Sequence, residues 1–260
     1  MAIDGFPSSL SDLLIYVFAA AFATARISAL FFIMPVFTRV RLSGLLRSGL
    51  ALALVVPIFP MMVNELSQNQ MTSIMILLFL FKEVIVGGLL ALVLGVPFWA
   101  AEAAGDIVDL QRGSMMGNLI DPSMTYETSI TGTLLAIITI MVFISAGGLG
   151  FTLHSLYVSY NIWPVGNIIP ELTEQTVFVF LDLLTRIMVM SITLMFPLIT
   201  SFLLSDIVFA FIARASPHLN IFALSLVVKT LVYCVVFAVY SSFLIGYLKY
   251  YIVDMGGWNI

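Results

Sequence analysis

Residues 71–100 read MTSIMILLFLFKEVIVGGLLALVLGVPFWA, an apolar run whose only charged side chains are Lys82 and Glu83. The run is long enough to cross a hydrocarbon core of ~30 Å, which takes about 20 helical residues. It lacks the alternation of period two that is typical of a half-buried strand. Because backbone groups in lipid have no water to bond, a helix is the favoured structure. The stretch therefore predicts a membrane helix.

Five further apolar runs of this kind lie at residues 13–37, 45–63, 130–157, 177–204 and 219–248. Of the 260 residues, 62% are hydrophobic and 9% are charged, and the mean hydropathy is +1.15. Such a chain has too little polar surface to cover a water-soluble globule. We predict an all-α membrane protein of about six long hydrophobic helical segments, with broken helices, forming a single domain over residues 1–260.

Several classes of function find no support in the sequence. The largest basic group, Arg39, Arg41 and Arg47, is too short to neutralise a nucleic-acid backbone. His154 and His218 stand far apart, with no acid or cysteine at ligand spacing, and no phosphate-binding GxxxxGK[ST] loop occurs. We predict no nucleic-acid binding, no metal, no cofactor and no catalytic residue, so the protein is not expected to be an enzyme.

Charged residues nevertheless interrupt the apolar runs, at a cost of roughly 3 kcal/mol for each one that faces lipid at mid-span. Asp182 and Arg186 lie four residues apart, on one helix face, where they can neutralise each other. Lys82 and Glu83 are adjacent and point about 100° apart, so each needs a partner elsewhere. A proton relay through the charges of the apolar runs is one hypothesis, and pairing between helices or subunits is the favoured one. The charges predicted to pair are Arg26, Lys82, Glu83, Asp106, Asp109, Asp182, Arg186 and Lys229.

Three carboxylates follow the run at 71–100 with the spacing i, i+4 and i+7, namely Glu102, Asp106 and Asp109. The helical rise spreads them over about 10 Å, which is too far for one cation. We predict a solvated or partner-facing stripe, in which Arg112 reaches Asp109 at i+3.

The segment QRGSMMGNLIDPSMTYETS (111–129) is too short to span a membrane and too apolar for an ordinary loop. Gly113, Gly117 and the pair Asp121-Pro122 interrupt its helical pattern, while methionines supply deformable apolar side chains. Irregular backbone at membrane depth is tolerated where protein or an aqueous cavity surrounds it. The segment predicts a re-entrant loop that closes a channel as a hydrophobic constriction does, and a buried connector is the alternative.

Several stretches of the sequence together form a specific pattern: VPFWAAEAAGDIVDLQRGSMMG (96–117), Asp121-Pro122, Glu127-Thr128-Ser129, Gly147-Gly148, LYVSY (156–160), Trp163-Pro164-Val165-Gly166 and RASPHLNIFALSLVVK (214–229). This pattern resembles the T subunit of the type III secretion export apparatus (the SctT family), which is homologous to the flagellar export protein FliR. The branch rests on Asp109, Arg112-Gly113 and Tyr126–Ser129, which look more like the injectisome type.

The resemblance implies an inner-membrane export gate, in which one copy of this chain joins R and S subunits. The U and V subunits cap and feed the gate, and unfolded polypeptides pass through its centre. It also implies packing in a helical cone that is lifted out of the bilayer plane. A loop of the family plugs the pore, and the matching positions are Gln111, Arg112, Gly113, Ser114, Met115, Met116, Gly117, Asn118, Leu119, Ile120, Asp121 and Pro122.

Other hypotheses belong to different classes of protein. A flagellar FliR-type subunit would share the same overall pattern. An ion-coupled transporter would use the charges of the apolar runs as a relay, with Pro97 and Pro197 marking broken helices. An intramembrane hydrolase would need paired acids, for which Asp106 and Asp206 are the symmetric candidates.

Overall fold

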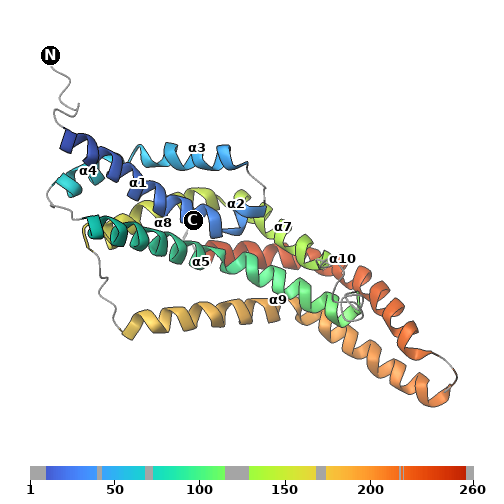
Figure 1. The fold of residues 1–260 in the computed structure, drawn as a ribbon. Coiled ribbons are helices and arrows are strands. Elements are labelled where there is room, and N and C mark those ends of the chain that lie inside the picture. The colour runs from blue at the N-terminus through green and yellow to red at the C-terminus, as the bar shows by residue number, and fades with distance from the viewer. Residues whose placement is uncertain are drawn as a thin grey trace. The chain divides into compact units, whose positions relative to one another are not determined.

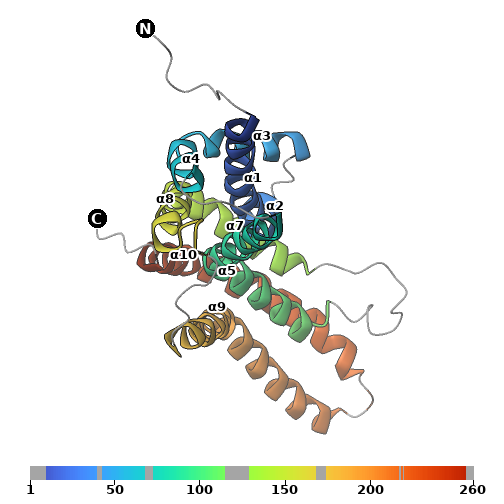
Figure 2. The same cartoon turned by 60° about the vertical axis from the view of Figure 1, so that its left-hand side comes forward.

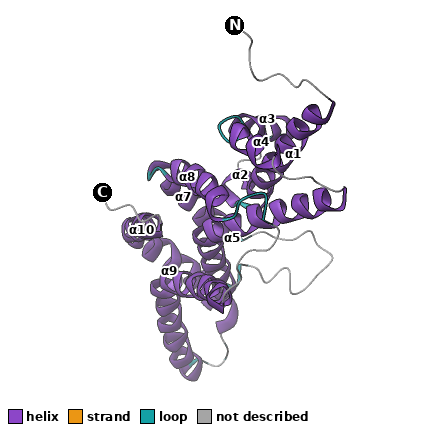
Figure 3. Cartoon of the chain, turned by 90° about the vertical axis from the view of Figure 1, so that its left-hand side faces the viewer, coloured by secondary structure: helices purple, strands orange, loops and turns teal. Residues whose placement is uncertain are grey.

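The structure is a computed structural model, and it describes residues 10–39, 43–67, 73–114, 129–167, 174–216, 218 and 220–255. Within these ranges every regular element is a helix, as Figure 3 shows by colour. The all-α prediction is therefore confirmed. The helices in Figure 1 are α1 (Leu10–Ile33), α2 (Pro35–Arg39), α3 (Gly44–Val55), α4 (Phe59–Ser67), α5 (Ser73–Arg112), α7 (Ile130–Ser145), α8 (Gly148–Ile162), α9 (Glu174–Ala215) and α10 (Ile221–Met255).

Among the described residues, four helical stretches are long and apolar enough to cross a membrane, and two bent helix pairs raise this number to as many as six. The predicted runs 45–63 and 130–157 are the bent pairs: α3 and α4 meet at 66°, and α7 and α8 meet at 75°. The prediction of about six segments with broken helices is thus confirmed. The four single stretches are Leu13–Ile33, Ile74–Arg112, Thr185–Ala215 and Ile221–Val253.

Local sequence accounts for where the helices break. Pro57 lies in the turn between α3 and α4, and because proline has no N–H it cannot donate the hydrogen bond that would continue α3. Gly147, between α7 and α8, has a φ of 78°, which glycine adopts without strain. Pro97 and Pro197, by contrast, lie inside α5 and α9, which continue through them.

The chain divides into two compact units. Unit 1 comprises residues 1–95 and 150–179, and unit 2 comprises residues 96–149 and 180–260. The boundary at residues 95 and 96 falls inside α5, so this helix contributes to both. A single family domain over residues 1–260 stays a prediction.

Unit 1 is built around α1, which packs against α2, α3 and α4. Figure 2 shows α3 and α4 beside α1. Phe22, Ile27 and Leu30 of α1 are fully buried. Gly87 of α5 lies so close to the carbonyl oxygen of Arg26 that an added Cβ would clash with it. This close approach brings the polar residues of α1 and α5 together.

Unit 2 holds the second part of α5 together with α7, α9 and α10. Its core includes Val108, Leu198, Phe202 and Tyr233, contributed by α5, α9 and α10. Much of the remaining surface is apolar: large side chains along α10, such as Val239 and Phe243, are more than 70% exposed. Exposed apolar surface of this extent must be covered by lipid or by other proteins.

Candidate functional site

The candidate site in unit 2 consists of the two places where the described chain borders the predicted loop, namely the end of α5 and the start of α7. Of the predicted plug positions, Gln111 and Arg112 form the end of α5, and Gly113 and Ser114 follow it. Met115, Met116, Gly117, Asn118, Leu119, Ile120, Asp121 and Pro122 lie outside the described residues.

The end of α5 is fixed by hydrogen bonds of the backbone. Gly113, with a φ of 77°, donates its N–H to Leu110 O at 3.1 Å, and Ser114 donates to Asp109 O at 3.1 Å. These two bonds form the Schellman arrangement that commonly ends helices at a glycine. An added Cβ at Gly113 would also clash with the Leu226 side chain of α10. The point at which the chain leaves α5 is therefore set by both local and tertiary contacts.

The start of α7 is fixed by Ser129, the N-cap residue. Its Oγ accepts the N–H of Gly132 at 2.8 Å, and this satisfies one of the free donors of the first helical turn. The same hydroxyl donates to Asp109 Oδ2 at 2.8 Å. The cap thus links α7 directly to α5.

Asp109 is the residue that both loop ends share. Its side chain is 1% exposed and accepts four hydrogen bonds: Oδ1 from Arg112 Nη2 (2.6 Å) and Thr131 Oγ1 (2.6 Å), and Oδ2 from Ser129 Oγ (2.8 Å) and Thr131 N (3.0 Å). A carboxylate offers about four acceptor positions, so this one is fully used. Its backbone carbonyl also accepts the N–H of Ser114 and, at 3.1 Å, its hydroxyl.

A cation–π contact and a hydroxyl contact join these residues to Tyr233 of α10. The Arg112 guanidinium lies over the Tyr233 ring, with Cζ 4.5 Å from the centroid. Thr131 Oγ1 lies 3.2 Å from the Tyr233 hydroxyl, which can donate to it because Thr131 gives its own proton to Asp109. We call Asp109, Arg112, Ser129, Thr131 and Tyr233 the loop-end cluster.

A pair of glycines sets the crossing of α5 and α7 beside this cluster. A Cβ added at Gly105 would clash with the backbone of Gly132. At Gly132 it would clash with the Asp106 carboxylate and lie 2.9 Å from Ser129 Oγ. Only glycine permits so close an approach of backbones. The crossing places Asp109, one turn beyond Gly105, at the positive end of the α7 dipole.

The predicted carboxylate stripe is therefore wrong for Asp109, which is buried inside unit 2 instead of facing solvent or a partner. Glu102 and Asp106 are half-buried. The spacing along one helix face was correct, but that face packs against α7.

Lys229 of α10 contacts both α9 and the end of α5. Its Nζ lies 2.8 Å from Asp206 Oδ1 of α9 and donates to Gln111 O at 3.4 Å. The Lys229 side chain is 10% exposed, whereas that of Asp206 is 46% exposed. Lys229 is thus a bridge at the edge of unit 2.

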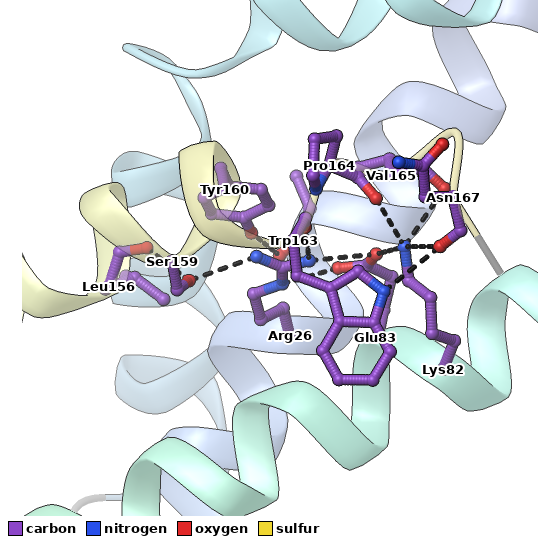
Figure 4. A network of polar contacts seen from close by, with 11 residues as sticks. Arg26, Lys82, Glu83, Leu156, Ser159, Tyr160, Trp163, Pro164, Val165 and Asn167 are labelled. Atoms are coloured by element: carbon purple, nitrogen blue, oxygen red, sulfur yellow. Dashed lines mark hydrogen bonds and ion pairs between the residues drawn. The ribbon is translucent and has the colours of Figure 1, made fainter. Parts of the chain in front are cut away.

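Unit 1 contains a separate set of buried charges, Arg26, Lys82 and Glu83, drawn in Figure 4. We call these three residues the unit 1 polar cluster. Glu83 accepts two bonds from Arg26, at 2.6 Å (Nε to Oε2) and 3.1 Å (Nη2 to Oε1). Lys82 Nζ lies 2.8 Å from Glu83 Oε1. The prediction that Lys82 and Glu83 each need a partner elsewhere is confirmed for Glu83 by Arg26 and for Lys82 by backbone carbonyls, and the long lysine side chain also bends back toward its neighbour.

Backbone carbonyls balance the excess positive charge of the unit 1 polar cluster. Lys82 Nζ donates to three carbonyl oxygens that follow α8: Pro164 (2.9 Å), Val165 (3.0 Å) and Asn167 (3.3 Å). The negative end of the α8 dipole lies here, so cations are favoured.

Arg26 reaches α8 as well. Its Nη1 donates to Ser159 Oγ and its Nη2 to Trp163 O, both at 3.0 Å. The guanidinium also lies 3.9 Å from the centroid of the Tyr160 ring (Figure 4). The unit 1 polar cluster therefore holds α1, α5 and α8 together.

Asp182 and Arg186 form the predicted i, i+4 pair on α9 at 2.6 Å, with both side chains about half exposed. The predicted charges thus belong to separate groups: the unit 1 polar cluster, the loop-end cluster with Lys229, and this surface pair. In the described part of the chain, no group of three or more His, Cys, Asp or Glu could hold a metal ion.

Some residues of these sites were missed in the sequence. Ser129 directly precedes an apolar run, which is a signal for an N-cap. Gly105, Gly132, Thr131 and Tyr233 carry no local signal, because their roles depend on tertiary packing.

Comparison with known proteins places this geometry in context. The family model described as "Bacterial export proteins, family 1" matches residues 17–255. The chain is 35% identical to Yop proteins translocation protein T of Yersinia pestis over 216 residues, 83% of this chain and 82% of that protein. It is 28% identical to Surface presentation of antigens protein SpaR of Salmonella typhimurium over 225 residues (86% and 83%). It is 26% identical to Flagellar biosynthetic protein FliR of Bacillus subtilis over 205 residues (78% of each).

Proposed function

Because this chain belongs to the bacterial export proteins, family 1, we propose that it forms part of an inner-membrane channel through which unfolded polypeptides are exported. It is a subunit of a type III export apparatus and is related to FliR, the flagellar counterpart. The injectisome branch is supported by the identity of 35% to the Yersinia translocation protein, against 26% to the flagellar protein of Bacillus.

One observation carries this proposal: the family match extends over residues 17–255, a range that includes most of both compact units and the residues between α5 and α7. The resemblance therefore includes the plug segment (Gln111–Pro122) and the residues that anchor it. A match confined to the hydrophobic helices would support membrane location alone.

The plug segment is proposed to close the channel when no substrate is present. Its apolar residues, such as Met116, Leu119 and Ile120, suit a hydrophobic constriction, which blocks ions by excluding water. Flexible methionine side chains can part around a passing polypeptide and close again. The hydrogen bonds at both loop ends support this role, because a constriction needs fixed supports.

R and S subunits are the proposed lateral partners, with U and V subunits at the entrance and one copy of this chain in each gate. The exposed apolar faces of α9 and α10 support burial against such partners and against lipid. Helix α5, with 40 residues, is roughly 60 Å long. Since a hydrocarbon core is ~30 Å thick, part of α5 would extend beyond it, and a location toward the periplasm is proposed from the family resemblance alone.

No catalysis is proposed for the chain, which is a structural component of a secretion apparatus. The buried charges support helix packing in this scheme, because each one contacts several fixed polar atoms of its own unit. The energy for export would come from other parts of the machine.

Native mass spectrometry of the chain, purified under mild detergent with its natural partners, tests the proposal. We expect one copy of this chain in a large complex with several copies of other small hydrophobic proteins. A monomer or a simple homodimer that takes up a solute on its own would instead support the transporter hypothesis.

A further inference from the structure

We propose that Asp109 is the positioning residue that fixes where the chain leaves α5 and where it enters α7. This inference rests on the proposed function, since it assigns to one buried carboxylate the support of the plug segment. Asp109 itself need not touch a substrate.

A single residue, Asp109, contacts both the end of α5 and the start of α7. The Asp109 carbonyl accepts the backbone N–H and the hydroxyl of Ser114, the last described residue before the loop. The Asp109 carboxylate accepts from Ser129, the first described residue after the loop, and from Thr131. The distance between the two ends is therefore set through one side chain and one peptide group.

The Asp109 carboxylate has no spare acceptor position. Four donors from three residues surround it, and the side chain is 1% exposed, so water cannot replace a lost partner. An asparagine has the same size but presents an NH₂ group on one side. The NH₂ group would face donors of Arg112, Ser129 or Thr131, so at least one of these hydrogen bonds would be lost.

The packing of α5 against α7 and α10 also has contacts that do not involve Asp109. Gly105 and Gly132 bring α5 and α7 into backbone contact, and Phe98 packs on Phe143 with ring centroids 5.2 Å apart. Val108 lies in the apolar core with Tyr233. Loss of the carboxylate is therefore expected to release Ser129 and Thr131 at the start of α7, and Arg112 at the end of α5, while the helices stay packed.

The test uses the assembled complex, purified and reconstituted into planar lipid bilayers without substrate. Its single-complex ion conductance is compared for the unsubstituted chain, Asp109→Asn and Thr131→Val. Thr131→Val removes one bond to Asp109 Oδ1 and keeps the side-chain shape. Asp182→Asn is the matched control, because that carboxylate is also paired with an arginine but is half exposed.

We expect Asp109→Asn complexes to form in normal amount and to leak ions several-fold more than the unsubstituted complex. Thr131→Val should show a smaller rise, and Asp182→Asn should show none. Normal conductance of the assembled Asp109→Asn and Thr131→Val complexes would overturn the inference. Failure of both variants to assemble would overturn it too, because Asp109 would then support the fold as a whole.

A rescue experiment separates a positioning role from a general loosening of the fold. In a Cys234→Ser background carrying Asp109→Asn, the exposed positions Ser114→Cys and Ile130→Cys are joined by a short bis-maleimide. We expect the joined loop ends to restore low conductance, whereas a persistent leak after verified cross-linking would contradict the positioning role.

A second variant distinguishes failure of this inference from failure of the proposed function. The combined substitution Met115→Gly and Met116→Gly alters the plug segment itself and leaves Asp109 intact. A leak in that variant with none in Asp109→Asn refutes the positioning role alone. The absence of a leak in every variant refutes the plug, and the inference with it.

Discussion

Arg26 and Glu83, 57 positions apart in the chain, form a two-point ion pair whose side chains are both 0% exposed. Bidentate pairing of a guanidinium with a carboxylate is among the strongest polar contacts in proteins. Breaking such a buried pair is costly, because the remaining charge has no partner. Loss of the Glu83 carboxylate would leave two buried cations without a counter-charge, because Lys82 contacts the same carboxylate.

Replacing Glu83 with glutamine is therefore expected to destabilise the protein by about 3–5 kcal/mol, because two buried cations lose their counter-charge. The melting temperature of the detergent-solubilised chain measures this effect. Asp182→Asn, at an exposed pair, should cost about 0–1 kcal/mol. Equal melting temperatures for the two variants would contradict the role given to the unit 1 polar cluster.

Gly105→Ala is expected to separate α5 from α7, since the new Cβ would clash with the backbone of Gly132. Overpacking of this kind costs about 1–3 kcal/mol, and the yield of assembled complex should fall. Gly246→Ala is the control in the same unit, because an added Cβ there meets no atom within 4 Å. If both alanine variants assemble equally well, the close crossing of α5 and α7 is not required.

Lys229→Leu removes the bridge from α10 to Asp206 and to the last turn of α5. We expect a double-mutant cycle with Asp206→Asn to give a coupling of about 0.5–3 kcal/mol, as contacting residues do. Arg186→Leu should have a smaller effect, since its pair lies half exposed on the surface of α9. Strict additivity of the Lys229 and Asp206 substitutions would show that the ion pair contributes no stability.

Met115→Gly combined with Met116→Gly is expected to raise the ion conductance of the assembled complex, because a constriction with smaller apolar side chains admits water. Secretion of a reporter substrate should continue, since the path is widened and not blocked. Unchanged conductance, with the variant verified in the complex, would count against the plug.

Contacts within one helix were predictable from spacing alone. The pairs Asp182–Arg186 and Asp109–Arg112 follow directly from the helical period, which places residues three or four apart on one face. Breaks at Pro57 and Gly147 likewise agree with local backbone preferences, although the sequence did not reveal that these breaks bend two of the six runs.

Contacts between helices could not be predicted from local sequence patterns. Nothing near Arg26 identifies Glu83 as its partner, and the burial of Asp109 depends on glycines at positions 105 and 132 that come together only in the fold. Lys82 and Glu83 were expected to need partners elsewhere, but nothing in the sequence identified those partners or the contact between the two side chains. Directions of side chains along a helix were correct, but a lysine has enough rotatable bonds to turn back toward oxygens supplied by another helix.

The central claim is that exported polypeptides pass the plug segment of this chain. A photo-reactive amino acid placed at Met115 in the assembled apparatus, with a substrate arrested during export, tests this most directly. The control position is Val239, on the exposed face of α10. The account predicts cross-links to the arrested substrate from position 115 and none from position 239. Cross-links from neither position, or from position 239 alone, would contradict it.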